Sequence, residues 1–279
     1  RAVACIEALI GREELTPFNR LWCNLRMGYY YPIIGNYARG IETLNQAVDI
    51  SVEHGLQGLR RISLLIGSYQ ISCYAMLGDL RTARKCRERM TLLVDPGRPM
   101  DAWHLCQSLV HIDATGGNYL GAQEGARQAR ESSDTAGMTY IKILSIEHEA
   151  GCAALLGDFD RLRDVLENLH HLIAGTCFAF FECQSRMYET YAEIVHGNPA
   201  RGQQLLQDFL RHAREIDLHY VQMARYTPIA GTVLAEALRI GMEVEYTRNT
   251  IRRFGIRAPV DAPGEWPWPV KVFTLGQFQ

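Results

Sequence analysis

The stretch "LLGDFDRL" (Leu155–Leu162) contains a dipeptide that recurs along the chain at a nearly constant interval. The chain has 24 glycines, and Asp or Asn follows only a few of them. These pairs lie about 40 residues apart, an interval typical of repeat proteins in which each repeat is one supersecondary unit. They are Gly35-Asn36, Gly78-Asp79, Gly117-Asn118, Gly157-Asp158 and Gly197-Asn198.

The dipeptide has a physical role at a turn between two helices. Glycine readily adopts the left-handed backbone conformation that closes a helix. An Asp or Asn side chain then accepts hydrogen bonds from the first N–H groups of the next helix. A large apolar residue usually follows the pair, and a small one such as Ala83 or Ala122 comes shortly afterwards, where two antiparallel helices can approach closely. Each unit is therefore predicted to be a helix–turn–helix.

A further segment, "LRIGMEVEYTRNTIRRFGI" (238–256), reads as a sixth unit in which Met follows Gly241. Terminal repeats are often atypical because one face has no neighbouring repeat. We therefore predict an all-α fold over residues 1–257. We expect it to be a superhelix of about six antiparallel helix pairs with a period of about 40 residues. The length of 279 residues is too great for one ordinary core but normal for an extended repeat protein.

The first unit resembles the tetratricopeptide repeat. Gly28 and Tyr31 stand where that motif has its Gly and Tyr before the turn, and Ala47 follows in the second helix. The standard period is about 34 residues. The longer, looser period of this chain resembles the helical sensor regions of large bacterial regulators of the MalT-like type. This resemblance implies a right-handed superhelix.

The end of the chain has a different pattern. "APVDAPGEWPWP" (258–269) has the composition of a stiff linker, and "VKVFTLGQFQ" (270–279) alternates as a strand does. "WPWPVKVFTLGQF" (266–278) resembles the entry into an OmpR-type winged-helix domain of a bacterial transcriptional activator. We therefore expect 270–279 to be the first strand of a truncated winged-helix domain. The resemblance implies a longer regulator with an ATPase module upstream, which would bind DNA only through its missing C-terminal domain.

Composition argues against several classes of function. At 47% hydrophobic and 22% charged residues, the chain is typical of a folded, soluble protein. No apolar stretch is long enough for a membrane span, and because no basic segment is followed by an apolar one, we expect no signal peptide. A net charge of −2 argues against a nucleic-acid surface. The eight cysteines form no C-x-x-C pair, which favours a reducing, cytoplasmic location and argues against a metal site.

No catalytic motif is found. "HEAGC" (His148–Cys152) begins like a zinc-binding H-E-x-x-H helix but has Cys in place of the second His, so we interpret it as a helix surface. The sequence contains neither a P-loop nor a nucleophile elbow. We therefore expect no enzyme activity, no catalytic residues, no metal and no cofactor.

Polar and aromatic side chains recur on the predicted first helix of each pair, which lines the groove in a tetratricopeptide-like register. His104, Gln107 and His111 are spaced so that they share one helical stripe. Another interpretation is that such side chains line a wet channel and pack against their neighbours. The candidate groove residues are Trp22, Tyr29, His104, Gln107, His111, Glu147, Gln184 and Tyr191, with Ser68, Ser72 and Met187 beside them.

These patterns lead to one functional hypothesis and one alternative. We expect a sensor and protein-interaction domain of a bacterial transcriptional regulator, which binds a small-molecule effector or a partner protein in its concave groove. Binding would be relayed to the flanking ATPase and DNA-binding domains. The alternative is a pure protein–protein scaffold with no small-molecule ligand. No membrane contact is expected, and the formation of a homodimer is left open.

Overall fold

The computed structural model describes residues 6, 8 and 15–268, apart from 96, 177 and 217–224. All regular structure within these ranges is helical, which confirms the all-α prediction. The predicted strand at 270–279 lies outside the described residues, as does the last residue of the predicted linker.

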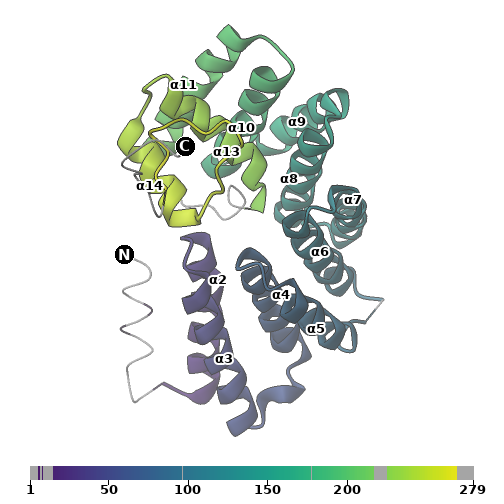
Figure 1. Ribbon diagram of the computed structural model, residues 1–279. Helices are drawn as coiled ribbons and strands as arrows, with labels where there is room; N and C mark the ends of the chain where they lie inside the picture. Colours follow the sequence, from purple (N-terminus) through teal and green to yellow (C-terminus); the bar gives the residue numbers. More distant parts are fainter. Residues whose placement is uncertain are drawn as a thin grey trace, which may run out of the picture.

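The described helices follow one another as consecutive pairs whose members pack together. Figure 1 shows the pairs arranged in a curved array that runs from α2 to α14. A short 3-10 helix, η1 (Leu56–Gly58), separates the first two pairs. The pairs are α2 (Pro17–Ile33) with α3 (Tyr37–Glu53), α4 (Arg60–Met76) with α5 (Leu80–Thr91), α6 (Pro99–Gly116) with α7 (Tyr119–Ala136), α8 (Thr139–Leu156) with α9 (Phe159–Ile173), α10 (Ala179–Val195) with α11 (Pro199–Glu215), and α13 (Thr227–Arg239) with α14 (Val244–Phe254).

The first four predicted turns have the expected backbone conformation. Their glycines have φ values between 73° and 82°, in the left-handed region where a residue with a Cβ is strained. The turn N–H groups satisfy carbonyl groups at the end of the preceding helix, as when the Asn118 N–H donates to the Asp113 carbonyl oxygen at 2.8 Å. The glycines concerned are Gly35, Gly78, Gly117 and Gly157.

The fifth turn differs from the prediction, which was wrong for Gly197. This glycine does not have a positive φ. The turn also differs at Asn198, because a proline favours extended backbone for the residue before it. Asn198 accordingly has φ −99° and ψ 113°, and its N–H donates to the Glu193 carboxylate at 2.8 Å.

The predicted Asp and Asn caps are present at all five turns. The Asn36 side chain accepts a hydrogen bond from the Arg39 N–H at 3.2 Å, and Asp158 accepts one from the Arg161 N–H at the same distance. The sixth pair has neither Asp nor Asn at this place, and its helix α14 has no side-chain cap. The remaining caps are Asp79, Asn118 and Asn198.

Small residues allow the helices of the first pair to approach closely. A Cβ on Gly28 would overlap the Leu44 side chain, and one on Gly40 would lie 3.0 Å from the Pro32 ring. Ala47 is fully buried in the same interface. The glycines in this pair therefore allow close packing between the helices. The free energy gained from this packing offsets the cost of placing glycine within a helix.

The two ends of the array contact each other. Figure 1 shows α14 beside one end of α2, and a Cβ on Gly35 would lie only 2.6 Å from the Arg253 carbonyl oxygen of α14. Arg225, just before α13, donates a hydrogen bond to the Ser72 hydroxyl of α4 at 3.2 Å. The curvature thus brings the last pair against the first two pairs.

The Pro-rich segment after α14 packs against the last pair. Trp266 is only 2% exposed and belongs to the main hydrophobic core. Arg239 of α13 donates to the Asp261 carboxylate at 3.0 Å. The described part of this segment is therefore held against the helices by one buried aromatic ring and by polar contacts.

Candidate functional site

The first helices of four pairs surround a cavity of about 480 Å³. Its walls come from α2, α4, α6 and α8, and Arg225 joins them from the segment before α13. This volume lies within the range of small-molecule sites in proteins, roughly 300–1,000 Å³. The cavity extends from Met100 to His111 along α6, a distance of roughly 16 Å at the rise of an α-helix.

The structure brings seven of the predicted groove residues together in this cavity. His104, Gln107 and His111 form a polar stripe along α6, and each is at most 8% exposed. Ser68 and Ser72 of α4 also line the cavity. Burying polar side chains costs free energy unless they are hydrogen-bonded, so a stripe of this kind requires partners. Trp22 and Tyr29 of α2 line the cavity as well.

The other candidate residues do not line this cavity. Glu147 and Gln184 have no exposed surface, and the same is true of Met187. Tyr191 is half-buried and packs against the main hydrophobic core. These positions therefore belong to the packed interior of the fourth and fifth pairs.

Tyr226 fills the inner surface at the fourth and fifth pairs. A Cβ on Gly151 of α8 would lie 2.5–2.8 Å from three atoms of the Tyr226 ring, so the ring rests directly on the helix backbone. The Tyr226 ring also lies 6.3 Å from the ring of Tyr188, and both side chains are completely buried. Tyr226 thus occupies the space that an open groove would need.

Several side chains that line the cavity were not predicted from the sequence. Tyr69, Trp103 and Tyr140 all lie on first helices. Tyr69 and Trp103 each adjoin a predicted groove residue, so a wider stripe on each helix would have included them. Arg225 stands outside the helix pairs, and no argument from repeat register could have placed it in the cavity.

Arg225 is held by a network of buried hydrogen bonds. Its guanidinium lies 3.3 Å from His148 Nε2, which the Gln107 side-chain amide also contacts. Because an arginine can only donate, His148 Nε2 accepts, and Nδ1 carries the proton. His148 Nδ1 then donates to the Tyr226 hydroxyl at 2.9 Å, and that hydroxyl donates to the His148 carbonyl oxygen at 3.2 Å.

The same geometry determines the orientation of the Gln107 amide. Since His148 Nε2 is an acceptor, Gln107 presents its NH₂ group to it, and its Oε1 is directed elsewhere. Oε1 has no hydrogen-bond partner among the described residues. The Nδ1 atoms of His104 and His111 also lack partners within the described part of the chain. The α6 stripe therefore retains unused hydrogen-bonding capacity.

His104, His111 and Tyr69 of the cavity wall are neutral at neutral pH. Burial lowers the pKa of His104 to about 4, with Arg61 adding to the effect and Asp101 opposing it. Burial, with the positive charge of Arg225 and the neighbouring His148, holds the pKa of His111 well below its usual value. Burial likewise raises the pKa of Tyr69 to about 12.

Aromatic rings form much of the remaining cavity wall. The rings of Tyr29 and Tyr69 lie 4.8 Å apart, and the hydroxyls of Tyr29 and Tyr140 are 3.3 Å apart. The Trp103 indole N–H donates to the Ser145 hydroxyl at 3.1 Å. The Trp103 ring is therefore fixed in orientation by a bond made outside the cavity.

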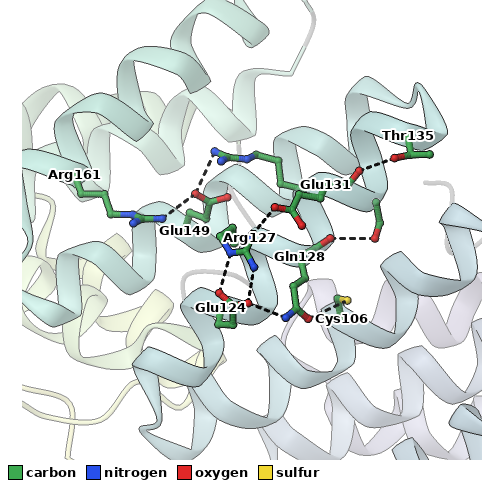
Figure 2. Close-up of polar contacts among 10 residues, drawn as sticks. Cys106, Glu124, Arg127, Gln128, Glu131, Thr135, Glu149 and Arg161 are labelled. Carbon is green, nitrogen blue, oxygen red and sulfur yellow. Dashed lines mark hydrogen bonds and ion pairs between the residues drawn. The ribbon is translucent and has the colours of Figure 1, made fainter. Parts of the chain in front are cut away.

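A second buried polar cluster lies apart from the cavity. Glu149 of α8 is 1% exposed and lies between Arg130 of α7, at 3.2 Å, and Arg161 of α9, at 3.5 Å (Figure 2). Burial raises the pKa of Glu149, and the two arginines oppose this effect. Two cations from flanking helices form ion pairs with Oε2 of this carboxylate, and these ion pairs join three successive helices.

The structure corrects the interpretation of "HEAGC" as a helix surface. His148 and Cys152 have no exposed surface, and Glu149 is almost completely buried. Helix α8 is enclosed because it packs against α7, α9, α10 and α13. In the part of the chain that the structure describes, no three His, Cys, Asp or Glu side chains are grouped as a metal site.

Within the described ranges, no helix combines the length and apolar character needed to cross a bilayer. Comparison of the chain with models of known protein families gave no match, and comparison with curated proteins gave none either.

Proposed function

We propose that this chain is an effector-binding sensor domain of a bacterial transcriptional regulator, built as a tetratricopeptide-like superhelix of the MalT-like kind. The observation that carries the proposal is the cavity of about 480 Å³. Four successive first helices contribute to it, and its wall combines aromatic rings with a stripe of buried polar groups. Such a combination is typical of sites that bind small molecules.

The form of the cavity favours a small molecule over a peptide. Arg225 and the α6 stripe are almost completely buried, and a continuous peptide chain would have to be desolvated to reach them. Peptide-binding modes use an open groove or a sheet edge. Tyr226 fills the continuation of the groove at the fourth and fifth pairs.

Arg225 supports a mechanism for relaying ligand binding. It contacts Ser72 of α4 and His148 of α8, and it adjoins the last helix pair. A ligand that contacts this residue would therefore interact with the first, middle and last parts of the array at once. Such a ligand stabilises the arrangement it binds best, by the population shift that underlies allosteric coupling.

The C-terminal segment supports the assignment to a transcriptional regulator. "WPWPVKVFTLGQF" (266–278) resembles the entry into a winged-helix domain, and its first residue, Trp266, lies in the same core cluster as Tyr226. Tyr226 in turn bonds to His148, which contacts Arg225. We infer that packing changes at the cavity reach the DNA-binding domain through this core. A sequence after Gln279 in the parent gene that encodes no winged helix would contradict this part of the proposal.

The test is thermal unfolding of the purified chain with a panel of small metabolites, followed by titration calorimetry of every compound that raises the midpoint. Leu65 lines the cavity, so Leu65→Trp should fill it and abolish binding. Leu77 lies at the end of the same helix and is 52% exposed, so Leu77→Trp is the matched control and should bind as the wild type does.

A ligand that binds Leu65→Trp as tightly as the wild type would exclude the cavity as its binding site. A chain that captures a partner protein but no metabolite would favour the scaffold alternative.

A further inference from the structure

Helix α5 carries a row of exposed cations, called here the α5 stripe, which consists of Arg81, Arg84, Lys85 and Arg89. Their spacing places these residues on one face of the helix, over a length of roughly 12 Å. Glu88, which is exposed on the same face, is the only acidic residue of α5. The face therefore carries an excess of positive charge.

The second helices of the next three pairs treat their cations differently. Every arginine of α7, α9 and α11 forms an ion pair with a carboxylate. Within the part of the chain that the structure describes, neither the four cations of the α5 stripe nor Glu88 forms an ion pair. The α5 stripe thus differs from the other outer faces in leaving its cations available to a partner.

The α5 stripe does not serve the stability of its own helix. Lys85 lies four residues from both Arg81 and Arg89, and like charges at this spacing destabilise a helix. Arg81 and Lys85 act at longer range on Asp79, but the Asp79 carboxylate caps α5 by accepting the Thr82 N–H at 3.0 Å. An anionic partner would relieve the repulsion along this face.

A groove with mainly apolar walls adjoins the α5 stripe. Helices α3 and α5 both pack on α4, and the groove of about 200 Å³ is lined by residues of all three helices. Ile66 and Met90 are its buried residues, whereas Val48 and Val52, one turn apart on α3, are 38% and 57% exposed. Arg89 lines the groove as well. The groove and the α5 stripe therefore meet at this arginine.

This combination favours an acidic protein segment over a nucleic acid. A phosphate backbone would pair with the α5 stripe, but it has no apolar side chain to place beside Val48 and Val52. The net charge of −2 gives the chain no overall attraction for nucleic acid. Protein interfaces, in contrast, combine an apolar centre with a polar rim, and complementary charges at the rim select the partner.

We propose that the α5 stripe and the adjoining groove form a docking surface for an acidic segment of a partner protein. Carboxylates of this segment lie against Arg81, Lys85 and Arg89, and a bulky apolar side chain lies in the groove beside Val52. The docking surface and the effector cavity use different faces of α4, because Leu65 lines the cavity whereas Ile66 lines the groove. The inference therefore goes beyond the proposed function and does not depend on it.

The test measures the fluorescence anisotropy of two labelled synthetic peptides that carry the same charge. The first has a Leu-Phe-Leu core between two runs of glutamate, and the second has Ser-Ser-Ser in place of that core. The wild-type chain should bind the first peptide about tenfold more tightly, because only this peptide has apolar side chains to bury in the groove. Binding of both peptides should weaken as the salt concentration is raised.

Reversing two charges of the α5 stripe tests its role. Arg81→Glu combined with Lys85→Glu should weaken binding of the first peptide by about tenfold or more. Both residues are exposed, and the change removes repulsion between like charges, so the variant should unfold no earlier than the wild type. The control with the same change in charge is Arg252→Glu combined with Arg257→Glu at exposed positions at and after the end of α14. This control should bind as the wild type does.

Three further variants test the groove. Val52→Ser should remove the preference for the first peptide, whereas Val260→Ser, at a fully exposed position after α14, should retain it. Leu65→Trp, which fills the effector cavity, should leave the binding of both peptides unchanged.

Four results would contradict the inference. Binding of neither peptide to the wild-type chain would overturn it, and equal binding of the two peptides would overturn the role of the groove. Unchanged binding to the α5 variant would overturn the role of the α5 stripe. A random-sequence DNA duplex that binds more tightly than either peptide, and less tightly to the α5 variant, would assign the stripe to phosphate groups instead. The proposed function is tested separately by the metabolite panel, since none of these results concerns the effector cavity.

Discussion

The inner surface of α2, α4, α6 and the start of α8 encloses a cavity, whereas the inner surface of the rest of α8 and of α10 is filled. Both regions consist of first helices in consecutive pairs, and both carry polar side chains on the inner face. In the first region His104 and His111 line open space. In the second, Glu147 and Gln184 are completely buried. The difference comes from Tyr226, a residue outside both sets of helices.

This comparison teaches that repeat register alone does not define a binding groove. A position in the groove register becomes a ligand contact only where no other part of the chain occupies the space. Here the segment before α13 folds back, so that Tyr226 rests on Gly151 while the neighbouring Arg225 reaches the cavity. Tyr226 thus fills one region, and the adjacent Arg225 supplies a charged group to the other.

The largest expected effect is from removing the side chain that fills the second region. Tyr226→Ala should lower the free energy of unfolding by about 3–5 kcal/mol, because it leaves a cavity in a fully packed core and breaks the hydrogen bonds to His148. Urea denaturation followed by circular dichroism measures this change.

Tyr226→Phe is the matched control for that experiment. It keeps the ring but removes the hydroxyl, and should cost about 1–2 kcal/mol. If Tyr226→Ala proved no more destabilising than Tyr226→Phe, the ring would not fill the second region, and the contrast between the two regions would not hold.

A change in stability of intermediate size is expected when the pH is lowered, because of His104 in the cavity wall. His104 has a pKa of about 6.5 in the unfolded state, whereas burial in the folded state lowers this pKa to about 4. The unfolded state therefore binds more protons between these values, and stability falls as the pH falls from about 6.5 to about 4. His104 alone should account for a loss of about 2 kcal/mol by pH 5.

Urea unfolding of the wild type and of His104→Gln at pH 7.5 and pH 5 measures this contribution. The variant should lose about 2 kcal/mol less than the wild type over this interval. His54→Gln at the exposed end of α3 serves as the control and should follow the wild type. An identical loss in wild type and His104→Gln would mean that His104 is not buried in its neutral form.

The smallest changes in stability are expected when one of two glycines within first helices is replaced by alanine. Gly151→Ala should destabilise the protein by about 1–2 kcal/mol, because the new Cβ would overlap the Tyr226 ring. Gly67→Ala on α4 meets only ordinary contacts at 3.7–3.8 Å, and should stabilise the protein by about 0.5–1 kcal/mol. Thermal unfolding of both variants checks the opposite signs. Stabilisation by both would show that Tyr226 can move away from α8 at little cost.

Most of the fold could be predicted from local sequence patterns. The Gly-Asp and Gly-Asn pairs indicated the turns and the helix caps, because both depend on backbone conformation and hydrogen bonds within a few residues. The different backbone at Asn198 in the fifth turn is also local, since Pro199 directly follows it. The buried state of "HEAGC" could not be predicted in this way, because it depends on packing against helices distant in sequence.

The sequence by itself determined where the helices begin and end, and it indicated that His104, Gln107 and His111 share a stripe, because helix periodicity is a property of neighbouring residues. Only the tertiary structure decided which inner positions remain open. The curvature of the array brings Arg225 and Tyr226 against α4 and α8. Such contacts join residues more than 70 positions apart, and they are set by the sum of many helix packing angles. No single stretch of sequence encodes that sum.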